Sequence, residues 1–434
     1  MNNYAVRLQL YTRLRYTLTM TLSEELVWRG FNNQTTYKDL SVLDDQPITF
    51  YWGVDPSSDS MTIGNLTAAM MVKTFARHGH KPVLLIGGAT GMIGDPDGKS
   101  EERQLKSAED IKRNKAAIVK QYEQIFGGHK FVPVDNYDWF KDMGYLQFLR
   151  DIGKHVPMRQ MLARDFVQTR LSESGGGISY AEFSYVLMQA YDYYYLYKNH
   201  GVNLQVCGSD QWGNSIAGVE LIRRITGGEA HVYSIPILVN QITGIKFGKS
   251  EAGAVWLDAN KTTPTQFYQF WINTDDDSVE RYLKIFTELT KEDINDTMSK
   301  HNDNKQKRLA QNVLARQVTT LIHGEGEMHS AETVTKCLIG KVPVGDASED
   351  TLGIIRQEIA NVKAAENGSL VAALVGCGLA TSNTSARQLL AGQAVSINNV
   401  KVMREYFEPT DFQNGRLLIR RGKAFKDSAL VELG

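Results

Sequence analysis

The sequence predicts an α/β fold with a parallel sheet, followed by a helical region and a small C-terminal α+β unit. Residues 48–55 alternate between apolar and polar side chains, residues 65–77 have helical spacing, and residues 82–87 are an apolar run. Strand, helix and strand in this order are typical of a parallel α/β unit. After residue 263 the strand signal disappears, and it returns only near the C-terminus.

The rest of the α/β unit follows the same alternation. Helical spacing is present at residues 107–126 and 182–198, a buried strand is predicted at 202–207, and a helix is predicted at 214–224. Ligands of parallel sheets bind at the carboxyl ends of the strands. The loop of residues 208–214 would lie at one such end.

The C-terminal part changes character twice. Residues 263–340 are polar and helical in pattern, and a weakly patterned stretch that begins at 341 is expected to be a linker. Two short helices (369–375 and 385–390) and short strands around an Asn398-Asn399 turn are predicted beyond it. The expected divisions are an extension (1–19), the α/β part (20–240), the helical part (241–340), a linker (341–365) and the C-terminal unit (366–434).

Composition excludes several classes of protein. The chain has 434 residues, 48 Lys+Arg and 49 Asp+Glu, so no overall positive field marks a nucleic-acid binder. Three widely spaced cysteines exclude a disulfide framework and a cysteine zinc site, and they favour a reducing cytosol. No apolar run is long enough to span a membrane.

The first 19 residues contain three arginines and no acidic residue. They could be a targeting peptide, or a stretch upstream of a start at Met20. We expect the second, with a capped helix that begins in the sequence TLSEEL.

Two short segments indicate chemistry on a phosphate-rich ligand. Residues 51–65 run from a strand through a Pro-Ser-Ser turn to a Gly-Asn step that opens a helix, and free N–H groups at a helix N-terminus can bind anions. Residues 246–250 (KFGKS) place two lysines beside a glycine. Such a loop can neutralise charge that develops on a polyphosphate.

A polar stripe is predicted on the helix at 182–198. Tyr185, Gln189 and Asp192 are spaced i, i+4 and i+7, while most of the residues around them are apolar. Polar groups on a buried helix need partners, so these three could line a pocket. The alternative is a solvated stripe on an amphipathic helix.

Other motifs are rejected or left open. GDPDGKS at 94–100 has the wrong glycine spacing for a P-loop, and the glycines at 88, 91 and 94 do not match the dinucleotide fingerprint. What remains is a loop with Lys99 and Arg103 that could reach an anion. The histidines His78, His80 and His155 lack metal-ligand spacing, so packing or surface roles are expected.

Several blocks together resemble the bacterial-type tyrosyl-tRNA synthetases. The blocks are YWGVDP with TIGN, GGATGMIGDP, EFSYVLMQAYD, GSDQWGN and KFGKSEAGAVWLD, and the similarity extends over about residues 21–434. The resemblance implies a Rossmann-like class I synthetase catalytic domain with a helical connective insertion, an α-helical anticodon-side domain and an RNA-binding domain like that of a ribosomal small-subunit protein. It also implies a cytoplasmic homodimer that uses L-tyrosine, ATP with Mg²⁺ and tRNA(Tyr), with no bound zinc and no membrane.

The same resemblance implies roles for individual residues. Groups around the bound tyrosine would be Tyr51, Asp95, Tyr185, Gln189, Asp192 and Gln211. The ATP site would include Gly53, Asp55, Gly64, Gly208, Asp210, Lys99, Arg103, Lys246 and Lys249. Catalytic groups would be Lys246, Lys249, Ser250, Thr62, Asn65 and Ser57.

The chain departs from the family pattern at three positions. Thr62 and Asn65 stand where the two histidines of the HIGH motif are expected, and Trp52 is bulkier than usual. An asparagine can still donate to a ribose or phosphate oxygen, whereas threonine offers only a short hydroxyl. Stabilisation of the transition state is therefore expected to depend more on Ser57, Lys246 and Lys249.

Three other interpretations stay open at this point. A tryptophanyl-tRNA synthetase is one, since an indole N–H could also donate to Asp192. A non-catalytic RNA-binding protein on a degenerate synthetase scaffold is the second, suggested by the three departures. The third is a nucleotidyltransferase with a HIGH-type fold. The basic run at 416–426 is expected to contact tRNA phosphates in a salt-dependent way.

Overall fold

The computed structural model describes residues 20–96, 106–162, 165–172, 176–239, 247, 249–250, 253–422 and 427–434. Of residues 160, 165, 166, 249 and 250 it describes the backbone alone. The chain forms two compact units. Over the described residues, the first comprises 20–262 with 274–314, and the second comprises 263–273 with 315–434.

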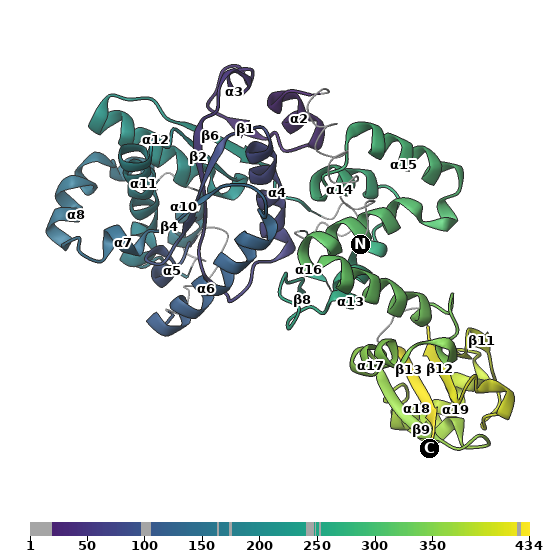
Figure 1. The fold of residues 1–434 in the computed structure, drawn as a ribbon. Helices are drawn as coiled ribbons and strands as arrows, with labels where there is room; N and C mark the ends of the chain where they lie inside the picture. The colour runs from purple at the N-terminus through teal and green to yellow at the C-terminus, as the bar shows by residue number, and fades with distance from the viewer. Residues whose placement is uncertain are drawn as a thin grey trace. The chain divides into compact units, whose positions relative to one another are not determined.

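A six-stranded sheet forms the centre of the first unit (Figure 1). Its strands, in spatial order, are β1 (Gln34–Thr35), β6 (His231–Ile235), β5 (Leu204–Gly208), β2 (Thr49–Val54), β3 (Lys81–Ile86) and β4 (Val132–Asp135). All neighbours pair in parallel except β1, which is antiparallel to β6 at one edge. The predicted parallel α/β fold is confirmed.

Helices cover both faces of this sheet because neighbouring residues of a strand point to opposite sides. Phe50 in β2 contacts Phe75 of α4 (Ile63–Arg77), with ring centres 5.0 Å apart. The next residue, Tyr51, contacts Tyr193 of α11 (Tyr180–His200) at 5.1 Å. Helix α12 (Trp212–Thr226) packs beside α11, so β2 is buried on both faces.

The principal helices of the α/β part lie where the sequence predicts them, within two residues at each end. These are α4, α6 (Ala108–Ile125), α11 and α12. The expected capped helix in TLSEEL is α2 (Leu22–Arg29): Thr21 Oγ1 accepts from the Glu24 N–H, and Glu24 accepts in return from the Thr21 N–H. The edge strands β1 and β4 and the strand β6 were not predicted.

Shorter elements complete the first unit. The helices are α3 (Val42–Asp45), α5 (Thr90–Ile93), α7 (Tyr137–Phe140), α8 (Tyr145–Asp151), α9 (Met158–Leu162), α10 (Asp165–Leu171), α14 (Val279–Phe286) and α15 (Lys291–Asp303). Two short strands, β7 (Lys249–Ser250) and β8 (Gly253–Ala254), pair as a hairpin. Helices α7–α10, here called the insertion, lie between β4 and α11 along the chain.

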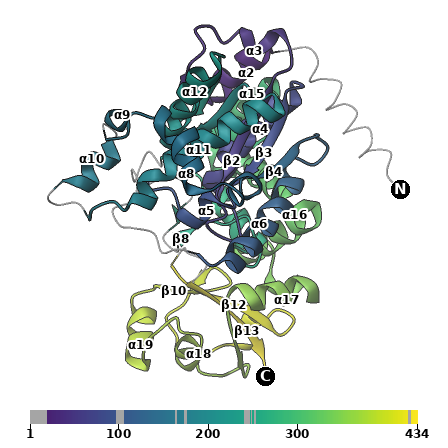
Figure 2. The same ribbon diagram turned by 90° about the vertical axis from the view of Figure 1, so that its left-hand side faces the viewer.

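The second unit combines helices with a five-stranded sheet (Figure 2). Its helices are α13 (Pro264–Ile272), most of α16 (Leu309–Leu338), α17 (Glu349–Glu358), α18 (Leu370–Gly376) and α19 (Asn383–Ala391). The strand order is β11 (Val400–Lys401), β10 (Val395–Ile397), β12 (Arg416–Arg421), β13 (Ser428–Leu433) and β9 (Ala360–Ala364). The φ of Gly324 is 85°, which interrupts α16 because a helix needs negative φ.

Both faces of the C-terminal sheet are also covered. Leu417 and Ile419 of β12 pack into a core with α18 and α19, whereas Leu418 between them packs with α17 and the end of α16. The predicted Asn398-Asn399 turn joins β10 to β11, and both residues have positive φ (46° and 69°), as this kind of hairpin turn requires.

The segment at 341–365, expected to be a linker, is instead structured. It contains α17 and β9, and β9 pairs in parallel with β13 along five residues. The alternation in β9 is weak because this edge strand is mostly exposed. Among the described residues, no helix is both long and apolar enough to cross a membrane.

Candidate active site

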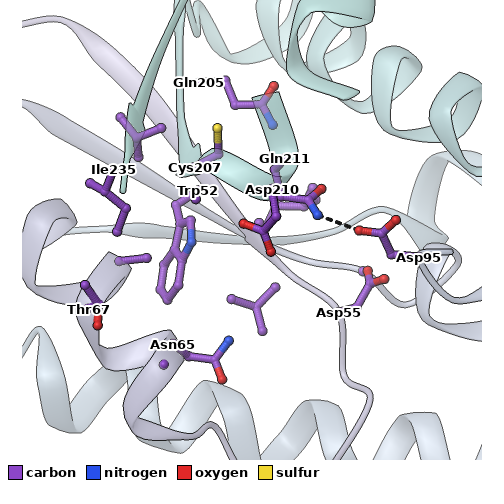
Figure 3. Close-up of a pocket in the computed structure, with 18 of the residues that line it drawn as sticks. Trp52, Asp55, Asn65, Thr67, Asp95, Gln205, Cys207, Asp210, Gln211 and Ile235 are labelled. Carbon is purple, nitrogen blue, oxygen red and sulfur yellow. Dashed lines mark hydrogen bonds between the residues drawn. The ribbon is translucent and has the colours of Figure 1, made fainter. Parts of the chain in front are cut away.

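A cavity of about 330 Å³ opens at the carboxyl ends of the parallel strands β2 and β5 (Figure 3). The N-terminus of α4, the middle of α11 and the loop after β5 supply the rest of its lining. Sheet topology explains the position, since the carboxyl ends of neighbouring parallel strands meet at one edge. The lining includes the predicted residues Tyr51, Gly53, Asp55, Ser57, Thr62, Gly64, Asn65, Asp95, Tyr185, Gln189, Asp192, Gly208, Asp210 and Gln211.

One end of the cavity holds a buried phenol and a buried carboxylate. Tyr51 and Asp192 are each 1 % exposed. The Tyr51 hydroxyl has no hydrogen-bond partner among the residues that the structure describes. A buried polar atom without a partner is costly, so this end of the cavity fits a ligand that carries a hydrogen-bonding group.

Asp192 is held by two donors that the sequence did not reveal. Trp139 Nε1 donates to its Oδ1 at 2.9 Å, and Asn136 Nδ2 donates to its Oδ2 at 3.0 Å. Burial raises the pKa of the Asp192 carboxyl well above its ordinary value, and these two donors oppose that rise. They therefore support the ionised form of the carboxylate in a place that disfavours charge.

A continuous hydrogen-bond chain connects Asp192 to Asp55. The second proton of the Asn136 amide goes to Thr90 Oγ1 (2.9 Å), and the Thr90 hydroxyl donates to Asp55 Oδ1 (2.7 Å). The Tyr185 hydroxyl donates to Asp55 Oδ2 at 2.8 Å. Burial and the nearby carboxylates raise the pKa of Tyr185, so its hydroxyl stays a donor. The network fixes four side chains of the cavity wall relative to one another.

Asp95 and Gln211, two further residues expected near the bound tyrosine, also line the cavity. Gln211 Nε2 donates to Asp95 Oδ2 at 2.5 Å, and Asn214 Nδ2 donates to Gln211 Oε1 at 3.2 Å (Figure 3). Gln189, one turn from Tyr185 on α11, leaves its Oε1 buried without a partner among the described residues. The carbonyl oxygen of Gln189 thus remains available to a donor on a ligand.

Gly53 and Trp52 of β2 form a closely packed part of the remaining wall. A Cβ on Gly53 would meet the Leu85 side chain at 3.3 Å, which is tighter than an ordinary contact, so a larger residue in this position would press on another residue of the cavity lining. Trp52 stands in the cavity in Figure 3 and packs on Tyr122 and Phe126, with ring centres 5.6 and 6.5 Å away. This aromatic wall narrows the side of the cavity next to α4.

The segment after KFGKS is attached directly to the start of α4. The Ile63 N–H donates to the Val255 carbonyl at 3.0 Å, and the Leu257 N–H donates to the Met61 carbonyl at 2.9 Å. Within KFGKS, the Phe247 N–H donates to the Leu238 carbonyl at 2.8 Å, and Phe247 lines the cavity. Phe247 of the motif and the residues from Val255 onward therefore both contact the wall of the cavity.

Some predicted residues lie outside the described part of the chain. These are Lys99, Arg103 and Lys246, together with the side chains of Lys249 and Ser250. The backbone of Lys249 and Ser250 belongs to β7, which pairs with β8.

Two of the three histidines have structural partners, as expected. His80 Nδ1 accepts from the Ile48 N–H at 3.2 Å, and burial lowers the pKa of His80 to about 4. His78 Nε2 lies 2.7 Å from a Glu25 carboxylate oxygen. Over the described ranges, the side chains form no group of three His, Cys, Asp or Glu that could hold a metal.

Known proteins match nearly the whole chain. Residues 43–339 match the family described as tRNA synthetases class I (W and Y), and residues 353–426 match the tyrosine--tRNA ligase SYY-like C-terminal domain. A tyrosine--tRNA ligase 2 of Bacillus cereus is 43% identical over 429 residues, which is 96% of this chain and 100% of the relative. Tyrosine--tRNA ligase of Levilactobacillus brevis is 41% identical over 93% of this chain and 98% of its own length.

A solved structure shows the same fold over the larger part of the chain. The C-terminally truncated Aspergillus nidulans mitochondrial tyrosyl-tRNA synthetase is 30% identical with a TM-score of 0.66, and the match covers 76% of this chain and 97% of that one. Sequence and fold agree, and the chain belongs to the tyrosine--tRNA ligase family of class I tRNA synthetases.

Proposed function

We propose that this chain activates L-tyrosine with ATP and transfers it to tRNA(Tyr), and that the cavity at the ends of β2 and β5 is where activation occurs. The observation that carries the proposal is the buried pair at one end of the cavity. The partnerless Tyr51 hydroxyl and the Asp192 carboxylate form a matched donor and acceptor for a phenol O–H.

Activation is a substitution at phosphorus that needs no acid or base from the protein. A carboxylate oxygen of tyrosine attacks the α-phosphorus of ATP, the bond to the bridging oxygen breaks, and pyrophosphate leaves as an anion. A ribose hydroxyl at the 3′ end of the tRNA then attacks the tyrosyl carbonyl carbon and releases AMP. The protein's contribution to the first step is positioning together with stabilisation of charge on phosphorus.

The tyrosine roles follow the geometry of the cavity walls. Tyr51 and Asp192 would bind the phenol, while Asp95, Tyr185 and Gln189 would surround the ammonium group. Gln211 would lie near the substrate carboxylate, since its amide already reaches Asp95 on the same wall. If phenylalanine entered instead, the buried Tyr51 hydroxyl would stay without a partner and Asp192 would lack the additional donor that a phenol supplies, which is unfavourable.

The nucleotide roles fall on the side of α4 and of the loop after β5. Gly53, Gly64, Gly208, Asp55 and Asp210 would line the ATP and adenylate site. The groups that would stabilise the negative charge on the phosphates are Ser57, Ser250, Lys99, Arg103, Lys246 and Lys249.

Mg²⁺ would enter with ATP, held mainly by phosphate oxygens, and would neutralise part of their charge. Carboxylate oxygens suit this ion, and Asp95 and Asp210 of the cavity wall could add such ligands. Every step that this chain performs is otherwise one of binding and orientation.

The proposal extends to the other parts of the chain. Residues 20–240 would carry the activation chemistry, 241–340 would hold the KFGKS loop and the helical anticodon-side domain, and the C-terminal sheet domain would bind tRNA. Arg421 donates to Asp427 and to the Leu379 carbonyl, and Arg416 pairs with Glu349 and Glu432. Of the described arginines in the basic run, Arg416 is therefore the one most fully engaged by carboxylates.

A homodimer in the cytosol completes the proposal. Seven large apolar side chains among the described residues of the insertion and the start of α11 are exposed, which suits contact with a second copy. They are Tyr137, Tyr145, Leu146, Met158, Leu162, Leu171 and Tyr180. All three cysteines are free thiols, in keeping with a reducing compartment.

The decisive experiment is ATP–pyrophosphate exchange with tyrosine, tryptophan and phenylalanine measured in parallel. We expect exchange that depends on tyrosine, with little signal from the other two amino acids. Exchange that depends on tryptophan would show that tryptophan, and not tyrosine, is the amino-acid substrate. The absence of exchange with all three would instead favour a non-catalytic RNA-binding protein.

A further inference from the structure

The side chain of Asn65 is fastened at its oxygen by the residue that begins α4. Asn65 Oδ1 accepts from the Thr62 backbone N–H at 2.9 Å and from the Thr62 hydroxyl at 3.0 Å. Thr62 is itself fixed, because it pairs with Trp256 in a β-bridge and the following Ile63 N–H bonds to the Val255 carbonyl. Asn65 is thus attached at two points to a rigid part of the cavity wall.

Chemistry alone decides which way the Asn65 amide points. A backbone N–H can only donate, so the amide atom that faces Thr62 must be the oxygen. The amide nitrogen then lies on the other side, and Figure 3 shows it facing the cavity. Within the part of the chain that the structure describes, Asn65 Nδ2 makes no hydrogen bond. Two N–H donors are therefore presented to the cavity.

The same contacts limit what Thr62 can do. A hydroxyl has one proton, and the proton of Thr62 is directed at Asn65 Oδ1. The Thr62 backbone N–H is used by the same oxygen. While this pair is intact, Thr62 has no donor left for a phosphate.

We propose that Thr62 is a positioning residue that acts through Asn65. Its two hydrogen bonds hold the amide of Asn65, which is already expected to donate to a ribose or phosphate oxygen, and Thr62 itself does not contact the nucleotide. This inference rests on the proposed activation of tyrosine by ATP. It revises the expectation that Thr62 itself contacts the nucleotide. The two residues form one unit in which the first orients and the second binds.

Single variants separate the two roles. Thr62→Val keeps the shape of the side chain and removes one of the two bonds to Asn65, so we expect kcat for tyrosine-dependent exchange to fall roughly five- to tenfold. The Kd for tyrosine should stay unchanged. Thr62→Ser keeps the hydroxyl and should restore the rate. Asn65→Asp keeps the acceptor for Thr62 but loses both donors, so it should be at least as slow as Asn65→Ala.

Thr74→Val is the matched control. It removes a hydroxyl from the same helix. Thr74 Oγ1 donates to the Met70 carbonyl at 2.9 Å, and Thr74 does not line the cavity. Exchange by this variant should equal that of the unmodified chain. An equal loss in Thr74→Val and Thr62→Val would contradict a positioning role for Thr62.

A double-mutant cycle decides between action through Asn65 and direct contact. In an Asn65→Ala background, adding Thr62→Val should change kcat by less than about twofold, because Thr62 affects the nucleotide only through the Asn65 amide, which is then absent. If Thr62→Val lowers kcat by the same factor in the unmodified chain and in Asn65→Ala, Thr62 contacts ATP directly and the inference is wrong. Failure of the proposed function would be seen separately, as absence of exchange in the unmodified chain.

Discussion

Asp192 shows how a buried carboxylate can be kept ready for a phenol. Burial raises its pKa well above the ordinary value and favours the protonated acid, which accepts hydrogen bonds poorly. The donors Trp139 Nε1 and Asn136 Nδ2 act in the opposite direction. In the proposed site, specificity for a hydroxyl would therefore depend on Trp139 and Asn136, which do not line the cavity themselves.

Replacing one of these donors should change the pH dependence of tyrosine binding. Trp139→Phe keeps a ring that can stack on Tyr195, whose centre is 4.3 Å away, but removes the N–H to Asp192. Loss of a donor to the ionised form raises the pKa of Asp192 further. We expect weaker tyrosine binding, most pronounced at low pH and recovering as the pH rises, in equilibrium dialysis. Parallel pH profiles for the variant and the unmodified chain would count against this.

Tyr51 should show opposite effects on stability and binding. Its hydroxyl is buried without a partner among the described residues, so Tyr51→Phe removes an unsatisfied group. The free energy of unfolding of the free protein should rise by about 1 kcal/mol, while tyrosine binding weakens. Chemical denaturation and equilibrium dialysis measure the two effects. A variant that is clearly less stable would mean that the hydroxyl already has a partner in the free protein.

The sequence predicted the residues that line the cavity better than it predicted the residues that hydrogen-bond to them from behind. Tyr185, Gln189 and Asp192 could be found because helical spacing placed them on one stripe, and all three line the cavity. Asn136 and Trp139 could not, since they are 56 and 53 residues from Asp192 and follow the short edge strand β4. A four-residue strand with an exposed first half gives no clear pattern.

At the scale of elements, α4 is fixed at both ends. Its N-terminus lies at the cavity, and its C-terminal half is held by ion pairs to two other segments. Glu25 of α2 pairs with Arg29, Arg77 and His78, while Glu288, after α14, pairs with Lys73 and Arg77. The hydrogen bond with His78 and the charges of Arg77 and Arg29 hold the pKa of Glu25 far below its ordinary range in spite of burial. The network keeps the helix that carries Asn65 from shifting.

This network predicts a specific sensitivity to acid. Because the pKa of Glu25 is depressed in the folded chain, its stabilising effect is complete above the unfolded value of 4.5 and is lost as the pH falls below it. Glu25→Gln should lower the free energy of unfolding at neutral pH by roughly 3 kcal/mol, with a difference that narrows in acid. Urea titrations at several pH values measure this. A difference that does not change with pH would contradict it.

The elements also show where local sequence patterns stop being informative. Long and largely buried strands and helices were predicted within a few residues, as for α4, α11 and β3. The stretch at 341–365 was not, because β9 gains its structure from pairing with β13, about 70 residues later in the chain. Pairing between distant strands is decided by tertiary contacts, which no local pattern contains.

At the scale of the whole molecule, the exposed apolar side chains of the insertion predict self-association. Leu146 is 80 % exposed, and Leu146→Asp would place a charge in any contact made there. We expect this variant to sediment as a monomer and the unmodified chain as a dimer in analytical ultracentrifugation. Val400→Asp is the matched control, since Val400 is an apolar residue in β11 with 68 % exposure.

Two results of that sedimentation experiment would overturn the dimer contact. One is a dimer in Leu146→Asp that is as stable as the original. The other is a monomeric unmodified chain, in which case the exposed side chains would need another explanation.

The central claim is that tyrosine is recognised by its hydroxyl in the cavity, through Asp192. The most direct measurement is tyrosine-dependent pyrophosphate exchange by Asp192→Ala across a range of tyrosine concentrations. We predict that the KM for tyrosine rises roughly ten- to a hundredfold while the KM for ATP changes little, because a hydrogen bond to a charged group is lost only on the tyrosine side. An unchanged tyrosine dependence would contradict the account.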